Sequence, residues 1–132
     1  MRLEFIALVP HLYKMHFKDL TVYQKSLLVS AKIESEVLSI SDIERNLKDQ
    51  LRRASSSIIL NIAEGSGRFS PADRRNFFVI ARGSAFECSA ALDKIEGAQK
   101  HGFTEIKNLL EEISKMLFKM ISNLEKKIKA KN

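Results

Sequence analysis

Cysteine, proline, glycine and long apolar runs are all scarce in this chain of 132 residues. The single cysteine, Cys88, excludes a disulfide framework within the chain, and its small neighbours predict a core position for the thiol. Two prolines and five glycines are too few for the many turns of an all-β protein. No apolar run approaches the roughly 20 residues that a membrane span needs. We therefore expect a cytoplasmic protein with no membrane partner.

What the chain does have is helical periodicity. Hydrophobic residues make up 45% of it, enough for one sizeable core. Apolar or small residues recur at spacings of three and four in four segments, which predicts four amphipathic helices. Because the segments between them are short, we predict an all-α fold, an antiparallel up-down-up-down four-helix bundle. The predicted core positions include Val22, Ser26, Val29, Ile33 and Val37; Ile43, Leu47, Leu51, Ala54, Ile58 and Ile62; Phe77, Ala81, Ser84, Cys88 and Ile95; and Ile106, Ile113, Leu124 and Ile128.

Two predicted helix starts carry capping signals. Ser41, followed three residues later by Glu44, has the spacing of a capping box for the second helix. The first helix has Asp19 or Thr21 as its expected cap. The third helix is expected to run to about His101.

The stretch NIAEGSGRFSP, residues 61–71, connects the second and third predicted helices. It follows a helix and lacks the spacing of a P-loop or a dinucleotide fingerprint, so we interpret it as a turn. A glycine is expected to stop one helix in the left-handed conformation, and serine followed by proline starts the next. A carboxylate in the turn is expected to pair with Arg68. The predicted turn residues are Asn61, Glu64, Gly65, Gly67, Ser70 and Pro71.

The segment QLRRASSSIILNIAEGSGRFSPADRRNFFVIARGSAFE, residues 50–87, resembles the signature of the 23S rRNA intervening-sequence proteins. The upstream FKDLTVYQKS, residues 17–26, is similar to the usual opening of that family. The resemblance implies one four-helix domain over residues 15–132, with residues 1–14 as a variable or poorly ordered extension. It also implies a homopentameric barrel without an established enzymatic activity. The family fold is similar to that of the accessory variability determinant of diversity-generating retroelements, a basic pentamer that binds nucleic acid.

Positive charge is in excess and unevenly spread. The formal charge is +6 and the isoelectric point is about 9.6, which favours an acidic partner such as RNA or DNA. If the predicted hairpin is symmetric about Gly67, Arg52 and Arg53 lie at the same height along the helices as Arg82. Arg68, Arg74 and Arg75 then form a second basic cluster near the turn. The candidate nucleic-acid-binding residues are Lys48, Arg52, Arg53, Arg68, Arg74, Arg75 and Arg82.

Other roles for these cations remain open. Arg52 and Arg53 either bind nucleic acid, pair with Asp49 on the helix surface, or cross an interface between protomers. Arg74 and Arg75 either bind phosphate or form a solvated first turn. The lysines near the C-terminus are expected to be a solvated helix end. Phe78, between Arg74 and Arg82 at helical spacing, is expected to contact another protomer rather than form a basic and aromatic strip.

No catalytic constellation is evident. Neither a nucleophile with its base nor a pair of hydrolytic carboxylates can be argued from the sequence. The three histidines lack metal-ligand spacing, so we predict no metal, no cofactor and no enzyme. The expected partners are further copies of the chain together with structured RNA or DNA, or alternatively a protein that docks on the oligomer.

Overall fold

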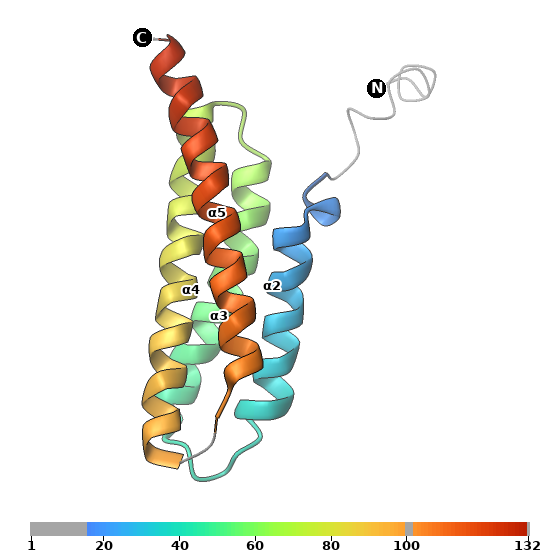
Figure 1. Cartoon of the computed structure of the whole chain (residues 1–132). Helices are drawn as coiled ribbons and strands as arrows, with labels where there is room; N and C mark the ends of the chain where they lie inside the picture. Colours follow the sequence, from blue (N-terminus) through green and yellow to red (C-terminus); the bar gives the residue numbers. More distant parts are fainter. Residues whose placement is uncertain (1–15, 100–101, 132) are drawn as a thin grey trace, which may run out of the picture.

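The computed structural model describes residues 16–99 and 102–131, which contain four long helices and no strand (Figure 1). The all-α prediction is confirmed. The extension predicted for residues 1–14 and the helix end predicted at His101 lie outside the described residues. In chain order the elements are the 3-10 turn η2 (His16–Asp19), α2 (Thr21–Lys32), the π-helical turn η3 (Ile33–Val37), α3 (Arg45–Ser66), α4 (Pro71–Gln99) and α5 (Thr104–Lys131).

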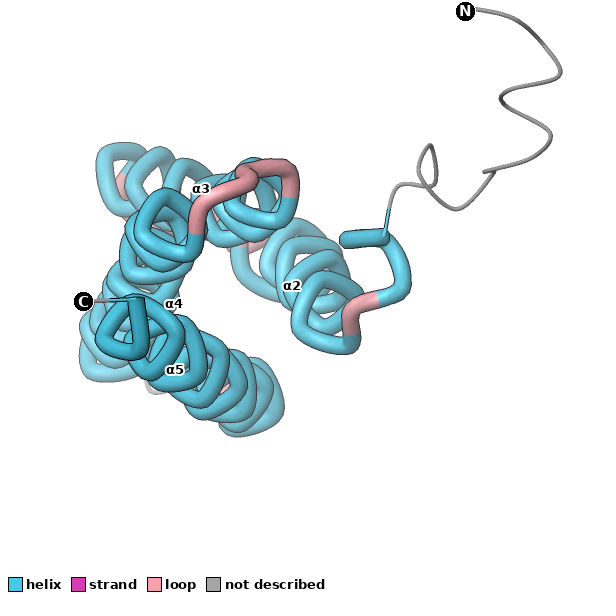
Figure 2. Tube along the Cα trace, turned by 90° about the horizontal axis from the view of Figure 1, so that it is seen from above, coloured by secondary structure: helices cyan, strands magenta, loops and turns pink. Residues whose placement is uncertain are grey.

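The four helices pack side by side, and each runs antiparallel to the next along the chain. Helix α3 packs extensively on α4, and α4 on α5, while α2 makes fewer contacts with its neighbours α3 and α5. Seen from above, α2 leans away from the other three helices (Figure 2). The order around the core places α2 and α4 diagonally, so their outer faces point in opposite directions.

The core is built from the faces that periodicity predicts. The positions predicted for the first helix are all buried, and η3 extends that face to Val37. On α3, Leu51, Ala54, Ile58 and Ile62 are fully or almost fully buried. Small residues at Ala81 and Cys88 let α4 approach its neighbours closely, and both are completely enclosed. Most core predictions for these helices are thus confirmed, although Leu47 is only half-buried.

The two helix starts between Asp19 and Glu44 differ from expectation. The N-cap of α2 is Leu20, and that of α3 is Glu44, and neither makes a side-chain capping bond. The hydroxyl of Ser41 instead donates to Asp42 Oδ1 at 3.5 Å. The capping box is therefore wrong, because α3 starts after Glu44 and Ser41 lies too far upstream to reach its first turn.

The start of α4 is as predicted. The backbone N–H of Asp73 donates to Ser70 Oγ at 3.1 Å, and Pro71 is the first helical residue. This hydrogen bond satisfies one of the unpaired donors of the first turn, and proline costs no intrahelical bond there.

The glycines of the turn do not act as a left-handed stop. Gly67, the C-cap of α3, has a φ of −86°, so its backbone is right-handed. Gly65 is buried within the last turn, where an added Cβ would lie 2.8 Å from Cε1 of the Phe78 ring. Gly65 therefore permits a close approach between α3 and α4, a packing role rather than a conformational one.

Phe78 belongs to the core of the chain. Its side chain is 1% exposed beneath Gly65, so it does not contact another protomer as predicted. The neighbouring Phe77, predicted as the core residue, is half-buried and lies under the guanidinium of Arg68 at 4.8 Å. At this end of α4 the buried position is therefore one residue later than predicted.

Candidate nucleic-acid interface

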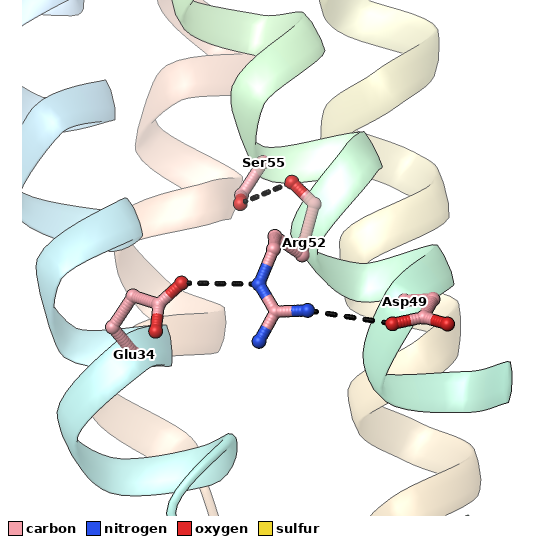
Figure 3. Close-up of polar contacts among 4 residues, drawn as sticks. All are labelled: Glu34, Asp49, Arg52 and Ser55. Atoms are coloured by element: carbon pink, nitrogen blue, oxygen red, sulfur yellow. Dashed lines mark hydrogen bonds and ion pairs between the residues drawn. The ribbon is translucent and has the colours of Figure 1, made fainter. Parts of the chain in front are cut away.

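Arg52, one of the candidate nucleic-acid ligands, is held between α3 and the end of the first helix. Its Nε donates to Glu34 Oε1 at 3.3 Å, and its Nη1 donates to Asp49 Oδ1 at 3.4 Å (Figure 3). Both carboxylates are about half exposed, so the two ion pairs contribute little stability. The alternative of intramolecular pairing therefore describes Arg52, whereas Arg53 makes no such pair in the described residues.

Arg82 lies on the side of α4 that faces α5. Its Nε donates to the carbonyl oxygen of Ser114 at 3.3 Å. Its guanidinium also lies over two exposed rings, 4.6 Å from that of Phe86 and 5.3 Å from that of Phe118. These contacts orient the cation along the surface between α4 and α5.

The predicted alignment of Arg53 with Arg82 is wrong. Ser84 Oγ donates to Ser57 Oγ at 2.7 Å, so residue 84 is level with residue 57 in the hairpin. Arg82 is then level with a residue two positions beyond Ser57, and Arg53 is level with Glu87 or its neighbour. Arg82 also contacts α5, while Arg53 lines the groove between α3 and α4, so the two do not form one basic level.

Of the polar residues predicted for the turn, Glu64 and Arg68 contact each other as expected, whereas Asn61 lies inside α3, which continues to Ser66, and bonds back to Ser57. Arg68 Nη2 donates to Glu64 Oε1 at 2.5 Å, the pairing that was predicted. Asn61 Nδ2 donates to the carbonyl oxygen and to Oγ of Ser57, at 2.8 and 3.0 Å. Both residues thus fix the last turns of α3.

The other two arginines of the turn are positioned differently. Arg75 Nη1 donates to Glu125 Oε1 on α5 at 3.3 Å. Nε of the adjacent Arg74 is buried without a hydrogen-bond partner in the described residues. Arg74 therefore retains an unsatisfied donor next to the ion pair that joins α4 to α5.

That ion pair brings two basic segments to one end of the molecule. Because α5 runs antiparallel to α4, its last turns lie beside the turn between α3 and α4 (Figure 1). Residues 64–75 and 125–131 together contain seven basic and three acidic residues, a net charge of 7 − 3 = +4. We call this surface the basic end; its cations are Arg68, Arg74, Arg75, Lys126, Lys127, Lys129 and Lys131.

Two lysines at the other end of the molecule, Lys32 and Lys107, are paired with carboxylates. Lys107 Nζ lies 2.6 Å from Asp93 Oδ1 and 3.3 Å from Glu96 Oε1, and hydrogen bonds to these two groups raise its pKa. A hydrogen bond to Glu105 likewise raises the pKa of Lys32. The basic end differs in gathering four lysines without an ion pair in the described residues on the last turns of one helix: Lys126, Lys127, Lys129 and Lys131.

Two candidate cations lie away from the basic end. Lys48 is half-buried on α3 and makes no ion pair in the described residues. Arg53 lines a groove between α3 and α4 together with Glu87. The described residues contain no group of three or more histidine, cysteine, aspartate or glutamate side chains placed to hold a metal ion.

Taken together, the fold defines a class: a small protein of four antiparallel helices with a concentration of basic residues at one end. No described helix is long and apolar enough to cross a membrane. The chain belongs to the 23S rRNA-intervening sequence protein family, whose model matches residues 18–119.

A solved structure supports this assignment. The chain is similar to a protein of unknown function from the S23 ribosomal protein family of Bacteroides thetaiotaomicron, with 28% sequence identity and a TM-score of 0.70. The match covers 76% of this chain and 98% of the Bacteroides chain. No curated protein matches the sequence.

Proposed function

We propose that this protein is a non-enzymatic, cytoplasmic homo-oligomer that binds structured RNA or DNA through the phosphate backbone, using the basic end as its contact surface. The observation that carries the proposal is the convergence of the α3–α4 turn and the last turns of α5, which places arginines and unpaired lysines together. Arginine suits phosphate because its planar guanidinium donates two parallel hydrogen bonds, and lysine adds charge without fixed geometry.

Assembly would multiply these contacts. A pentamer, the state implied by the family resemblance, carries a formal charge of 5 × 6 = +30. Identical basic ends then offer several weak phosphate sites to one nucleic acid, and binding at one raises the effective concentration at the others. Such a surface binds by charge and shape, with little dependence on base sequence.

Reversing two lysines of the basic end is expected to weaken nucleic-acid binding about 10- to 100-fold at 0.1 M salt. The variant is Lys127→Glu/Lys131→Glu; both side chains are exposed and make no ion pair in the described residues. Each lost phosphate contact should also lower the slope of log affinity against log salt by about 0.7 to 0.9. Fluorescence anisotropy with a labelled RNA hairpin and a DNA duplex, from about 50 to 300 mM salt, measures both quantities.

The matched control is Arg45→Glu/Lys94→Glu, which changes the net charge equally near the other end of the molecule. Both side chains are exposed without an ion pair in the described residues. We expect this control to retain most of the binding. Equal losses in the two variants would remove the basic end as the site, and no saturable wild-type binding at low salt would refute the proposal.

Exposed apolar side chains favour a second candidate, a scaffold that docks a protein partner or another protomer. Leu27 and Leu28 are exposed on α2, and Val79, Ile80 and Phe86 on α4. Since α2 and α4 are diagonal, one chain presents two apolar faces in opposite directions. Opposite faces suit a head-to-tail ring, because each copy can contact a different neighbour on each side.

Gly83 strengthens this second candidate. It is exposed in the middle of α4, between Val79 and Phe86 at helical spacing, and a Cβ added there would meet no atom within 4 Å. Glycine is about 1 kcal/mol less favourable than alanine inside a helix, yet none of the described residues needs the space at Gly83. Close approach of a helix from outside the chain would account for it.

Gly83→Ala is therefore expected to weaken self-association about tenfold or more, since an extra methyl group separates two closely packed surfaces. The matched control is Gly97→Ala, which alters another open, exposed glycine of the same helix. The control should stabilise α4 by about 1 kcal/mol and leave the oligomeric mass unchanged. Sedimentation and light scattering over a range of concentrations measure the association. An unchanged dissociation constant for Gly83→Ala would exclude a close contact at this position.

A further inference from the structure

The groove between α3 and α4 has a polar lining that is not part of the basic end. It has a volume of about 280 Å³ and is lined by Gln50, Arg53, Ala54, Ser57, Ser84 and Glu87. Of these lining residues, Ser84 donates through Oγ to Ser57 Oγ at 2.7 Å, and Asn61 Nδ2 donates to the same Ser57 oxygen at 3.0 Å. Because these bonds occupy the acceptor sites of the Ser57 hydroxyl, its proton is available to a ligand.

Two opposite charges line the groove without pairing. Arg53 and Glu87 are both exposed, and neither forms an ion pair or a side-chain hydrogen bond in the described part of the chain. Comparable exposed pairs elsewhere, such as Lys115 with Glu111, do make contact. The groove therefore offers guanidinium donors from α3 and carboxylate acceptors from α4 to the same occupant.

This combination restricts the ligand. A simple anion would be repelled by Glu87, and a simple cation by Arg53. A suitable ligand presents two acceptors on one edge and two donors on another, and it is small, because the groove lies at the lower limit of ligand-pocket volumes, about 300 Å³. Guanine fits this description: O6 and N7 accept from arginine in the commonest base-specific contact, and its N1–H and N2–H donors lie side by side.

We infer that this groove selects an unpaired guanine, an inference that rests on the proposed nucleic-acid binding. Arg53 donates to O6 and N7, and Glu87 accepts from N1–H and N2–H. Adenine, cytosine and uracil each lack part of this pattern, since none presents two neighbouring donors to a carboxylate together with two acceptors to a guanidinium. Arg53 lies 14 residues before Gly67, which in a helix is about 20 Å from the basic end. One strand can therefore bind the basic end through phosphates and place a base in the groove several nucleotides away.

The test compares labelled uridine 11-mers whose central base is guanine, inosine or adenine. We expect the wild type to bind the guanine 11-mer about tenfold more tightly than the adenine one, with inosine between them because it lacks the N2 donors. Arg53→Gln and Glu87→Gln should each abolish this preference while the salt-dependent binding of all three RNAs persists. Lys127→Glu/Lys131→Glu should weaken all three equally and keep their order.

Free GMP and AMP, titrated at millimolar concentration and followed by NMR, distinguish a nucleotide from a nucleic acid as the source of the base. A preference for GMP with no preference among the 11-mers would assign the groove to a free guanine nucleotide. No preference in either arm overturns the inference, and intact salt-dependent binding in that case leaves the proposed function standing. A change of oligomeric mass in Arg53→Gln and Glu87→Gln, without a change in base preference, would instead make the groove a contact between protomers.

Discussion

Phe78→Ala is expected to lower the free energy of unfolding by about 3 to 5 kcal/mol, the usual cost of removing a fully enclosed phenylalanine. The ring is 1% exposed and lies against Gly65, where α3 and α4 approach closely. With the ring removed, Gly65 has no side chain that could fill the space. Urea denaturation followed by circular dichroism measures the change, with the m-value checked for two-state behaviour.

Phe69→Ala is the matched control. Phe69 is fully exposed in the turn between α3 and α4, only nine residues from Phe78. Its truncation should alter the free energy of unfolding by less than about 0.5 kcal/mol. Because association also stabilises a folded state, both variants are compared with the wild type at one protein concentration. Similar losses in the two variants would contradict the core position of Phe78.

The buried faces were predictable because a helix repeats every 3.6 residues, so spacings of three and four mark one side. This held for α2 and α3, where the buried Val29 and Ile58 follow the predicted spacing even beside other apolar residues. It failed at the start of α4, where Phe77 and Phe78 are adjacent and both apolar. Here the choice between the two rings depends on the close approach of α3 at Gly65, a tertiary contact.

The candidate site was less predictable than the fold. Net charge indicated an acidic partner, but the partners of each arginine depend on the register and on the facing of the helices. Arg52 pairs with Glu34, 18 residues earlier, and Arg75 pairs with Glu125, 50 residues later. The lysines after Glu125 were interpreted as a solvated helix end. Antiparallel helices of similar length would have placed them beside the α3–α4 turn, and that signal was available in the sequence.

The polar groove was missed for a related reason. Ser57 and Asn61 are four residues apart on one helix, and Ser84 lies on the next. From the sequence, Asn61 is predicted to belong to the turn and Ser84 to be a small residue of the core. The hydrogen bond between Ser84 and Ser57 requires the exact register of the hairpin, which turn chemistry alone does not define.

Cys88 is expected to react with a thiol reagent about 1000-fold more slowly in the native protein than in the unfolded chain at pH 8. Burial, followed by the nearby charge of Glu87, raises the pKa of its thiol from 9.0 to about 12. The thiolate fraction at pH 8 then falls from about one tenth to about one ten-thousandth, and burial in the core adds a barrier to the reagent. Absorbance of released thionitrobenzoate, in buffer and in denaturant, measures the two rates. Native labelling within tenfold of the unfolded rate would show that Cys88 is accessible.

The raised pKa of Cys88 also predicts how the free energy of unfolding depends on pH. Since the folded pKa of Cys88 is raised to about 12, the unfolded chain loses its thiol proton first as the pH rises past about 9. The folded state then binds more protons than the unfolded one, so the free energy of unfolding falls, by up to about 1.4 kcal/mol per pH unit. Lysines and tyrosines titrate in the same range, so the wild type is compared with Cys88→Ala. The wild type should lose stability more steeply between about pH 9 and 11; parallel curves would mean that the buried thiol is not held protonated.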